Sequence, residues 1–175
     1  GSCIPFTVVE TTEDGSQRRR AIHWPKRAND ALKSSYVSEI GLYHSSRYID
    51  AVRSNYATVA DLAVSFYQVV LDKEARPWYR FQDASGNIYQ MTRMLMGLSV
   101  SCELMHLITE VLVGAPHAVQ PEFSIKSASV QVFVDGARAT SHTRIKADDV
   151  ATLWAKNTAF AGALWKKPPI VAQTY

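Results

Sequence analysis

Two short apolar stretches of the sequence each end in an aspartate, and this pair constrains the fold more than any other feature. Residues 57–60 precede Asp61, and residues 130–134 precede Asp135. Two such stretches can lie side by side in one sheet and bring both carboxylates to the same edge. Mg²⁺ suits such a pair, because it commonly takes one or two protein carboxylates and fills its other positions with water and phosphate oxygens. As the alternative, both aspartates are ordinary turn or cap residues.

Length and composition favour a globular protein. The chain has 175 residues, of which 47% are hydrophobic, so one domain with a sizeable core is expected and disorder is not. No apolar run approaches the length of a membrane span, and no membrane partner is expected. Gly1-Ser2 is interpreted as a cloning scar, which leaves residues 3–175 as the domain. Cys3 and Cys102 form neither a metal-type cluster nor a disulfide framework, which favours an intracellular protein.

Basic residues are concentrated near the N-terminus, although the net charge is only +3. The block, called the basic block below, consists of Arg18, Arg19, Arg20, Lys26 and Arg27. Such a cluster is a candidate contact for nucleic-acid phosphates. A solvated face of a hairpin is the alternative.

Alternation and turn residues predict an α+β fold with a mostly antiparallel sheet backed by helices. Turn chemistry at Asp14-Gly15 and at Asp83–Asn87 separates the early strands. Strands are predicted over residues 6–10, 18–24, 57–60, 78–81, 88–92, 130–134, 137–140 and 170–172. Helices are predicted over about 45–55, from 101 to Gly114, and from Asp148 or its neighbour to Pro168-Pro169. Residues 26–35 and 115–127 are predicted as loops, the first with at most a short helical turn.

Two of these helices have a predicted apolar side. In the helix that Ser101 caps, the residues at helical spacing are Leu104, Leu107, Ile108, Val111 and Leu112. In the last helix they are Val150, Leu153, Trp154, Thr158, Ala161 and Leu164. Cys102 and His106 lie four residues apart and face the same way. They could hold a metal, but with no further ligand in view a half-buried helix face is the stronger interpretation.

Three stretches, in order, resemble the polymerase motifs of reverse transcriptases. Asp61–Leu71 resembles the first motif, in which an aspartate is followed by an aromatic residue, Tyr-Gln and an aliphatic pair. Arg93–Ser99 resembles the second, and Phe133–Gly136 resembles the third. The resemblance covers nearly the whole chain. It is strongest to the trypanosomatid retroelements that carry a tyrosine recombinase, the VIPER-like group.

The resemblance implies a division into fingers and palm. The fingers would be residues 3–45 and 72–95 approximately, and the palm residues 46–71 and 96–175. No thumb is expected, because the chain ends where a thumb would begin. Asp61 and Asp135 would be the catalytic carboxylates and would hold Mg²⁺ or Mn²⁺.

The resemblance also assigns contacts to nucleotide and nucleic acid. Arg20 falls where the family has a nucleotide-phosphate arginine, and Gln68 and Gly97 would lie near the substrate. Phe66 would be the steric gate that rejects a 2′-hydroxyl, with a core aromatic as the alternative. The remaining members of the basic block would contact nucleic acid: Arg18, Arg19, Lys26 and Arg27.

Three departures from the family pattern bear on activity. Gly136 stands where most relatives carry a second aspartate, Leu95 replaces the usual proline, and Thr12 or Glu13 replaces the usual fingers lysine. The loss of the second aspartate and of the fingers lysine, together with the missing thumb, favours a retroelement-derived, catalytically silent copy inside a host protein that binds RNA, DNA or a protein partner. A nuclear location is expected rather than a cytoplasmic one. The alternative is the fingers-palm portion of an active RNA-directed DNA polymerase using two-metal phosphoryl transfer. A third option is a pure scaffold domain.

Overall fold

The computed structural model describes residues 3–12, 14–40 and 53–174, and the chain divides into two compact units. Unit 1 comprises Gly1–Glu39 and Phe66–Cys102, and unit 2 comprises Ile40–Ser65 and Glu103–Tyr175. The polypeptide therefore enters each unit twice. Most of the helix predicted over about 45–55 lies outside the described residues. Within the described part of the chain, no helix combines the length and apolarity needed to cross a membrane.

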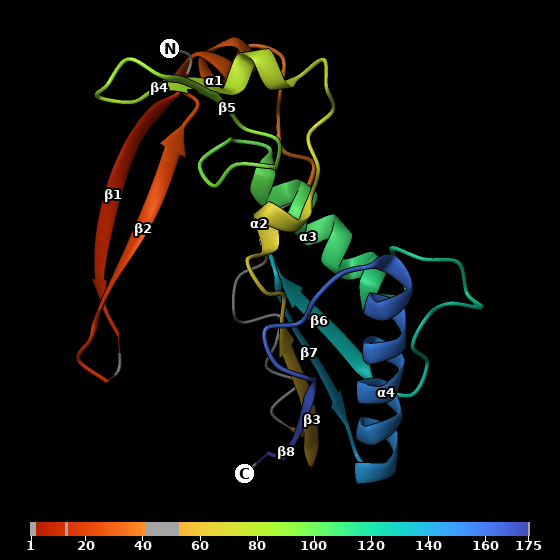
Figure 1. The fold of residues 1–175 in the computed structure, drawn as a ribbon. Coiled ribbons are helices and arrows are strands. Elements are labelled where there is room, and N and C mark those ends of the chain that lie inside the picture. Colours follow the sequence, from red (N-terminus) through yellow and green to blue (C-terminus); the bar gives the residue numbers. More distant parts are fainter. Residues whose placement is uncertain (1–2, 13, 41–52, 175) are drawn as a thin grey trace. The chain divides into compact units, whose positions relative to one another are not determined.

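Unit 1 begins with a β-hairpin (Figure 1). Strands β1 (Ile4–Thr11) and β2 (Gln17–Trp24) pair antiparallel along their whole length, which confirms the predicted hairpin. In the turn, the Thr12 N–H donates to Ser16 O at 2.8 Å, and Gly15 takes a φ of +79°. Most residues of both strands are exposed.

The rest of unit 1 surrounds a small apolar core. Its elements are α1 (Lys26–Leu32), α2 (Ser65–Gln68, of which Ser65 belongs to unit 2), the 3₁₀ helix η2 (Arg76–Tyr79), β4 (Arg80–Gln82) and β5 (Ile88–Gln90). The buried residues of this core are Cys3, Ala28, Tyr79, Leu95 and Leu98.

Two local predictions in unit 1 need correction. A helix of 7 residues, α1, occupies a stretch for which at most a short helical turn was predicted. The strand predicted from Trp78 begins only at Arg80, because Pro77 favours the first turn of a helix. The predicted turn between β4 and β5 is confirmed: Asp83 Oδ1 accepts from the backbone N–H groups of Ser85 and Asn87, both at 2.9 Å.

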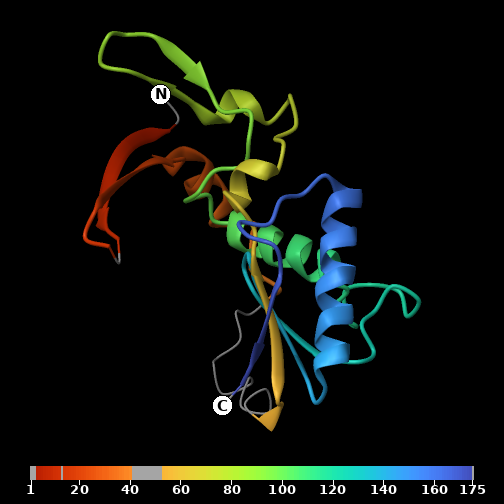
Figure 2. The same cartoon turned by 60° about the horizontal axis from the view of Figure 1, so that its bottom comes forward.

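Unit 2 is a four-stranded antiparallel sheet backed by a helix. The strands are β3 (Tyr56–Asp61), β6 (Ser129–Phe133), β7 (Gly136–Ser141) and β8 (Ile170–Gln173), in the order β6-β7-β3-β8. Helix α4 (Arg144–Ala161) covers one face of the sheet (Figures 1 and 2). The predicted antiparallel sheet with a helix behind it is therefore confirmed, and β8 is an edge strand as expected.

Small residues let α4 lie close to the sheet. Ala60, Ala137 and Ala139 are all buried on the covered face. Trp154 of α4 is fully buried, and its Nε1 donates to Val113 O at 3.0 Å. Thr58 Oγ1 donates to Ala147 O at 2.8 Å, which ties the central strand β3 to the helix. Burial of apolar area and satisfied polar groups thus stabilise the same layer.

Both ends of α4 differ from the prediction. Thr143, and not Asp148, is the N-cap, because its hydroxyl accepts from the Lys146 N–H at 3.4 Å. The helix stops at Gly162, which takes a φ of +67°, and not at Pro168-Pro169. Leu164 consequently lies beyond the helix and is 65% exposed, although it was predicted to be buried.

Helix α3 (Ser101–Leu112) has the predicted limits but an unexpected buried side. Leu104, Leu107 and Val111, which form much of the predicted apolar side, are 44%, 39% and 51% exposed. The buried residues instead include Met105 and three polar residues, His106, Thr109 and Glu110. Ser101 begins the helix without capping it, since its buried hydroxyl has no hydrogen-bond partner among the described residues.

Candidate nucleic-acid interface

Strand pairing in unit 2 brings the two aspartates together. Asp61 is the last residue of β3 and lies opposite Gly136 of β7, while Asp135 immediately precedes β7. The Leu62 N–H donates to Asp135 O at 3.0 Å and fixes the two strand ends to each other. Both aspartates line one groove of about 730 Å³. The two acids thus share one sheet edge, as predicted, and their roles as catalytic residues and metal ligands stay predictions.

The turn that carries Asp135 joins β6 to β7. Phe133 pairs with Gly136, so the two turn residues are Val134 and Asp135. Val134 has a φ of +57°, which a β-branched residue rarely adopts. A backbone conformation of this kind costs about 1–3 kcal/mol and occurs preferentially at functional sites. The strain therefore supports a functional role for this turn independently of any sequence motif.

Gly136 leaves room for the Asp61 carboxylate. A Cβ at position 136 would lie 3.0 Å from Asp61 Oδ1, which is closer than an ordinary van der Waals contact. Any side chain at this position, including the second aspartate that is usual in reverse transcriptases, would require Asp61 to move by a few tenths of an ångström.

The groove lies on the sheet face opposite α4. Thr58 points to α4, so Val59 and Asp61, which lie one and three residues further along the strand, point away from the helix. Arg138 pairs with Val59 in the register and shares that open face. Lys166 and Lys167, which follow α4, complete the basic lining.

Acidic, basic and apolar side chains all line the groove. Its charged residues are Asp61, Asp135, Arg138, Lys166 and Lys167, and its apolar residues include Val59, Phe133 and Ile170. The three basic residues of the groove were not predicted from the sequence. Alternation from Gly136 could have placed Arg138 on the open face, but no sequence signal places Lys166 and Lys167 there.

The donor set of the groove fits a hard divalent cation better than a structural zinc. Among the described residues, no three His, Cys, Asp or Glu side chains are grouped so as to hold a metal ion. Structural zinc sites need four such ligands. Mg²⁺ or Mn²⁺ could be held by Asp61 and Asp135 alone, with the other positions filled by water and phosphate oxygens.

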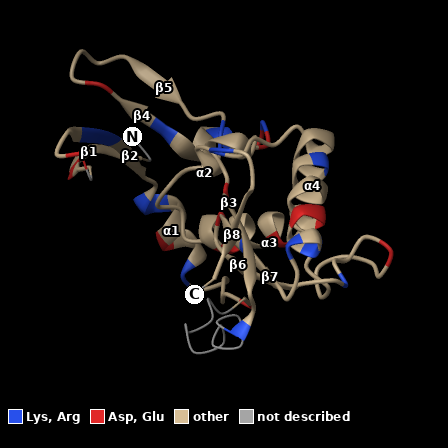
Figure 3. Cartoon of the chain, turned by 90° about the horizontal axis from the view of Figure 1, so that it is seen from below, with Lys and Arg blue, Asp and Glu red and all other residues tan. Residues whose placement is uncertain are grey.

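The basic block of unit 1 is partly neutralised by neighbouring acids. Arg20 Nε lies 2.7 Å from Glu10 Oε2, and Lys26 forms an ion pair with Asp30. Arg27 lies over the Trp78 ring at 5.5 Å from its centroid, a cation–π contact. Arg18 and Arg19 are exposed on β2. Figure 3 shows basic residues on this hairpin in blue. Arg18 and Arg19 are therefore the members best suited to contact phosphates.

The other predicted nucleotide contacts also belong to unit 1. Phe66 and Gln68 lie half-buried in α2. Gly97 lies in a turn with a φ of +101°, and Asn29 of α1 holds this turn by donating to Gly97 O at 2.9 Å. The left-handed φ explains why glycine is needed there. Val70, in the aliphatic pair that follows Gln68, is 58% exposed. The substrate roles of Arg20, Phe66, Gln68 and Gly97 stay predictions.

Solved structures with a similar fold are protease–reverse transcriptases of foamy viruses. A selenomethionine-labelled CSH mutant from prototype foamy virus is 19% identical, with a TM-score of 0.62 over 92% of this chain and 20% of its own. The foamy viral protease–reverse transcriptase dRH in complex with double-stranded DNA is 17% identical, with a TM-score of 0.66 over 94% of this chain and 27% of its own. The native prototype foamy virus protein is 22% identical, with a TM-score of 0.59 over 92% and 19%.

These likenesses establish a reverse-transcriptase-like fold. The chain spans 27% or less of the length of those proteins. No protein-family model and no curated protein matches the sequence.

Proposed function

We propose that this chain is a retroelement-derived module that binds RNA or DNA through the groove of unit 2. The observation that carries the proposal is the composition of that groove, in which Arg138, Lys166 and Lys167 surround the two carboxylates. Three positive and two negative charges leave the groove positive without any metal. Cations on an open sheet face suit the phosphate backbone, which supplies most of the affinity of non-specific nucleic-acid binding.

Apolar side chains in the groove supply a second kind of contact. Phe133 and Ile170 are 56% and 52% exposed. An exposed aromatic ring offers a stacking surface for a base, worth about 1–3 kcal/mol per base in single-strand binding proteins. One foamy viral protein of the same fold forms a complex with double-stranded DNA, which also supports the proposal.

The first experiment measures binding of fluorescently labelled RNA and DNA by anisotropy at several salt concentrations. In the Lys166→Ala/Lys167→Ala variant, we expect weaker binding and a smaller dependence of log Kd on log salt, by about one unit per lost phosphate contact. Lys146→Ala/Lys156→Ala is the matched control, because it removes two exposed lysines from α4 on the other side of the sheet.

Two outcomes contradict the proposal. Equal losses in the two double variants would show that only net charge matters. A Kd for RNA and DNA that does not change with salt concentration would indicate a protein partner instead. Replacement of Arg18 and Arg19 by alanine tests the basic block separately and leaves the ion pair of Arg20 in place.

A second candidate function is metal-dependent nucleotidyl transfer. Two observations favour it: Asp61 and Asp135 line one groove, and the turn that carries Asp135 is strained at Val134. Bound Mg²⁺ or Mn²⁺ would neutralise charge on the transferring phosphate and activate the attacking hydroxyl. The two aspartates would hold the ions, and the nearby lysines would hold the phosphate backbone. Gly136, which supplies no third carboxylate, favours binding without catalysis for this chain.

Thermal denaturation with and without Mn²⁺ tests the second candidate. We expect Mn²⁺ to raise the Tm if the site holds metal, and Asp61→Asn or Asp135→Asn to abolish the increase. Asp149→Asn is the control, since Asp149 is an exposed acid of α4. A Tm that does not change when Mn²⁺ is added would count against nucleotidyl transfer but would leave the nucleic-acid-binding proposal intact.

A further inference from the structure

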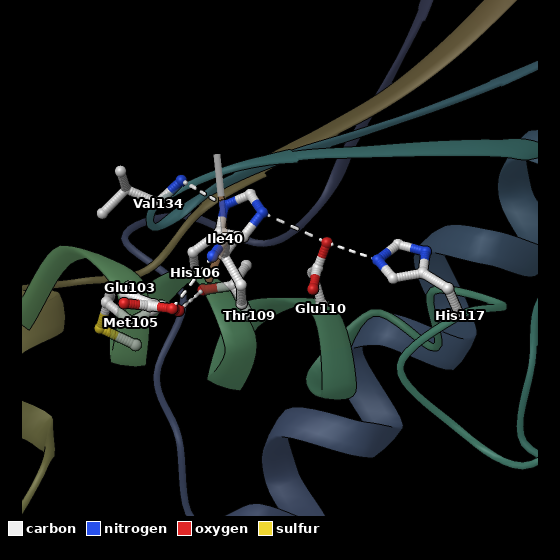
Figure 4. Close-up of polar contacts among 8 residues, drawn as sticks. All are labelled: Ile40, Glu103, Met105, His106, Thr109, Glu110, His117 and Val134. Carbon is white, nitrogen blue, oxygen red and sulfur yellow. Dashed lines mark hydrogen bonds and ion pairs between the residues drawn. The ribbon is translucent and has the colours of Figure 1, made fainter. Parts of the chain in front are cut away.

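Buried polar side chains lie behind the turn that carries Asp135 (Figure 4). His106 and Glu110 are one helical turn apart on α3 and are 1% and 5% exposed. His117, in the loop after α3, has a side chain that is 62% exposed. Figure 4 shows that the side chains of these three residues form a row that ends at the backbone of Val134.

A continuous set of contacts links the members of this row. His106 Nδ1 accepts a hydrogen bond from the Val134 N–H at 3.2 Å. His106 Nε2 lies 3.2 Å from Glu110 Oε1, within ion-pair distance but outside hydrogen-bond geometry. His117 Nε2 lies 2.6 Å from the same Glu110 oxygen. The contacts therefore run from the surface, through two buried side chains, to the turn.

The contact at Val134 defines the state of the His106 ring. An Nδ1 atom that accepts a hydrogen bond carries no proton, so in the neutral ring the proton resides on Nε2. The protonated Nε2 atom then lies 3.2 Å from Glu110 Oε1, and the nearby carboxylate favours this tautomer electrostatically. Glu110 in turn is held by His117.

The strain at Val134 explains why such a constraint is needed. A β-branched residue with a φ of +57° persists only where its surroundings fix the backbone. The hydrogen bond from the Val134 N–H to the buried imidazole of His106 supplies such a constraint. Loss of it would let the turn relax and would move the adjacent Asp135.

We propose that His117, Glu110 and His106 form a positioning network that holds the turn bearing Asp135 in its strained conformation. His106 contacts the turn, Glu110 lies beside Nε2 of the His106 ring and favours the tautomer that carries the proton there, and His117 anchors Glu110 from the surface. The effect on the turn is independent of any ligand. The further consequence, that the network places Asp135 for metal binding, rests on the second candidate function above.

The experiment measures hydrogen exchange of the Val134 amide by NMR without metal. In His106→Leu, which fills the space without an acceptor, we expect exchange about 5- to 30-fold faster, as the loss of about 1–2 kcal/mol implies. His106→Asn keeps an acceptor near the Nδ1 position, and we expect it to restore the protection at least in part. A merely structural role of the ring would not produce this difference. His142→Asn, an exposed histidine of unit 2, is the control.

Glu110→Gln and His117→Ala test the rest of the network. Imidazole ¹⁵N spectra should show a smaller population of the Nε2–H tautomer of His106 in Glu110→Gln. His117→Ala changes an exposed residue and should fold. It can therefore be measured even if the variants at the buried positions 106 and 110 do not fold. We expect faster exchange at Val134 in this variant as well.

If the exchange rate of the Val134 amide is unchanged in His106→Leu, the proposal is overturned. If His106→Leu does not fold, an unchanged rate in His117→Ala overturns it instead. Mn²⁺ is then added in a separate titration. Faster Val134 exchange in the variants, together with no Mn²⁺ binding by the wild-type protein, would support the network and reject the metal site. Failure of the network proposal can therefore be distinguished from failure of the metal-binding proposal.

Discussion

The contact between Gly136 and Asp61 gives the sharpest prediction. Gly136 is a strand residue whose φ is not in the left-handed region. A Gly→Ala change at such a site normally stabilises a protein by about 0.4–1 kcal/mol, because it reduces the freedom of the unfolded chain. Here the new Cβ would meet Asp61 Oδ1 at 3.0 Å, so the Asp61 side chain must move.

The cost of that movement can be bounded from the structure. Asp61 is exposed, so its carboxylate can rotate without repacking a core. Rotation of a side chain by about 30° from its preferred rotamer costs about 0.5–1.5 kcal/mol. This cost should cancel or exceed the usual gain, and we expect Gly136→Ala to be neutral to destabilising by about 1 kcal/mol.

A double-mutant cycle isolates the contact. Urea denaturation of the wild type, Gly136→Ala, Asp61→Ala and the double variant gives four free energies of unfolding. In the Asp61→Ala background no carboxylate opposes the new methyl group, so Gly136→Ala should stabilise. We expect a coupling energy of about 0.5–1.5 kcal/mol between the two positions.

A coupling energy indistinguishable from zero would refute the reasoning. It would mean that the Asp61 carboxylate does not lie against Gly136 in solution. The groove geometry would then have to be revised, because Asp61 would point elsewhere. A coupling of the expected size would also explain why position 136 accommodates no second aspartate without adjustment at Asp61.

Three further predictions concern other parts of the chain. Burial raises the pKa of the Cys3 thiol to about 11, so iodoacetamide at pH 8 should modify the exposed Cys102 and leave Cys3 unmodified in the folded protein; equal labelling would contradict this. Hydrogen bonds from Thr12 and then Ser16 lower the pKa of Asp14 from 3.8 to about 2. The support that ionised Asp14 gives the turn is therefore present above pH 3.8 and lost as the pH falls through about 2, which NMR shifts of Ser16 would follow. Trp154→Ala should reduce the free energy of unfolding by about 3–5 kcal/mol in urea, and a loss below 1 kcal/mol would exclude a central role in the core.

The sequence was sufficient for the features that depend on local chemistry. Short apolar stretches ending in an acid predicted β3 and β6, and Asp61 and Asp135 share one groove because β3 pairs with β7, which begins directly after Asp135. The hairpin of β1 and β2 followed from the Asp14-Gly15 turn. Each of these predictions needed only neighbouring residues to agree.

The features that depend on distant partners could not be predicted in this way. The apolar residues of α3 indicated a buried side with Leu104 and Leu107, whereas the structure buries His106 and Glu110. Those polar side chains are tolerated inside because Val134 and His117 supply partners, and both come from later segments of the chain. Apolar periodicity carries no information about such partners. For the same reason, it did not reveal Lys166 and Lys167 as groove residues.

The central position of β3 has a consequence for synthesis on the ribosome. This strand pairs with β7 and β8, which emerge only after residues 136–173 have been made. Until then its backbone donors and acceptors have no neighbouring strand, and open strand edges promote association between chains. Nascent chains that stall before Gln173 should therefore recruit chaperones or aggregate, and a screen of truncated reading frames would show solubility returning only once β8 is included.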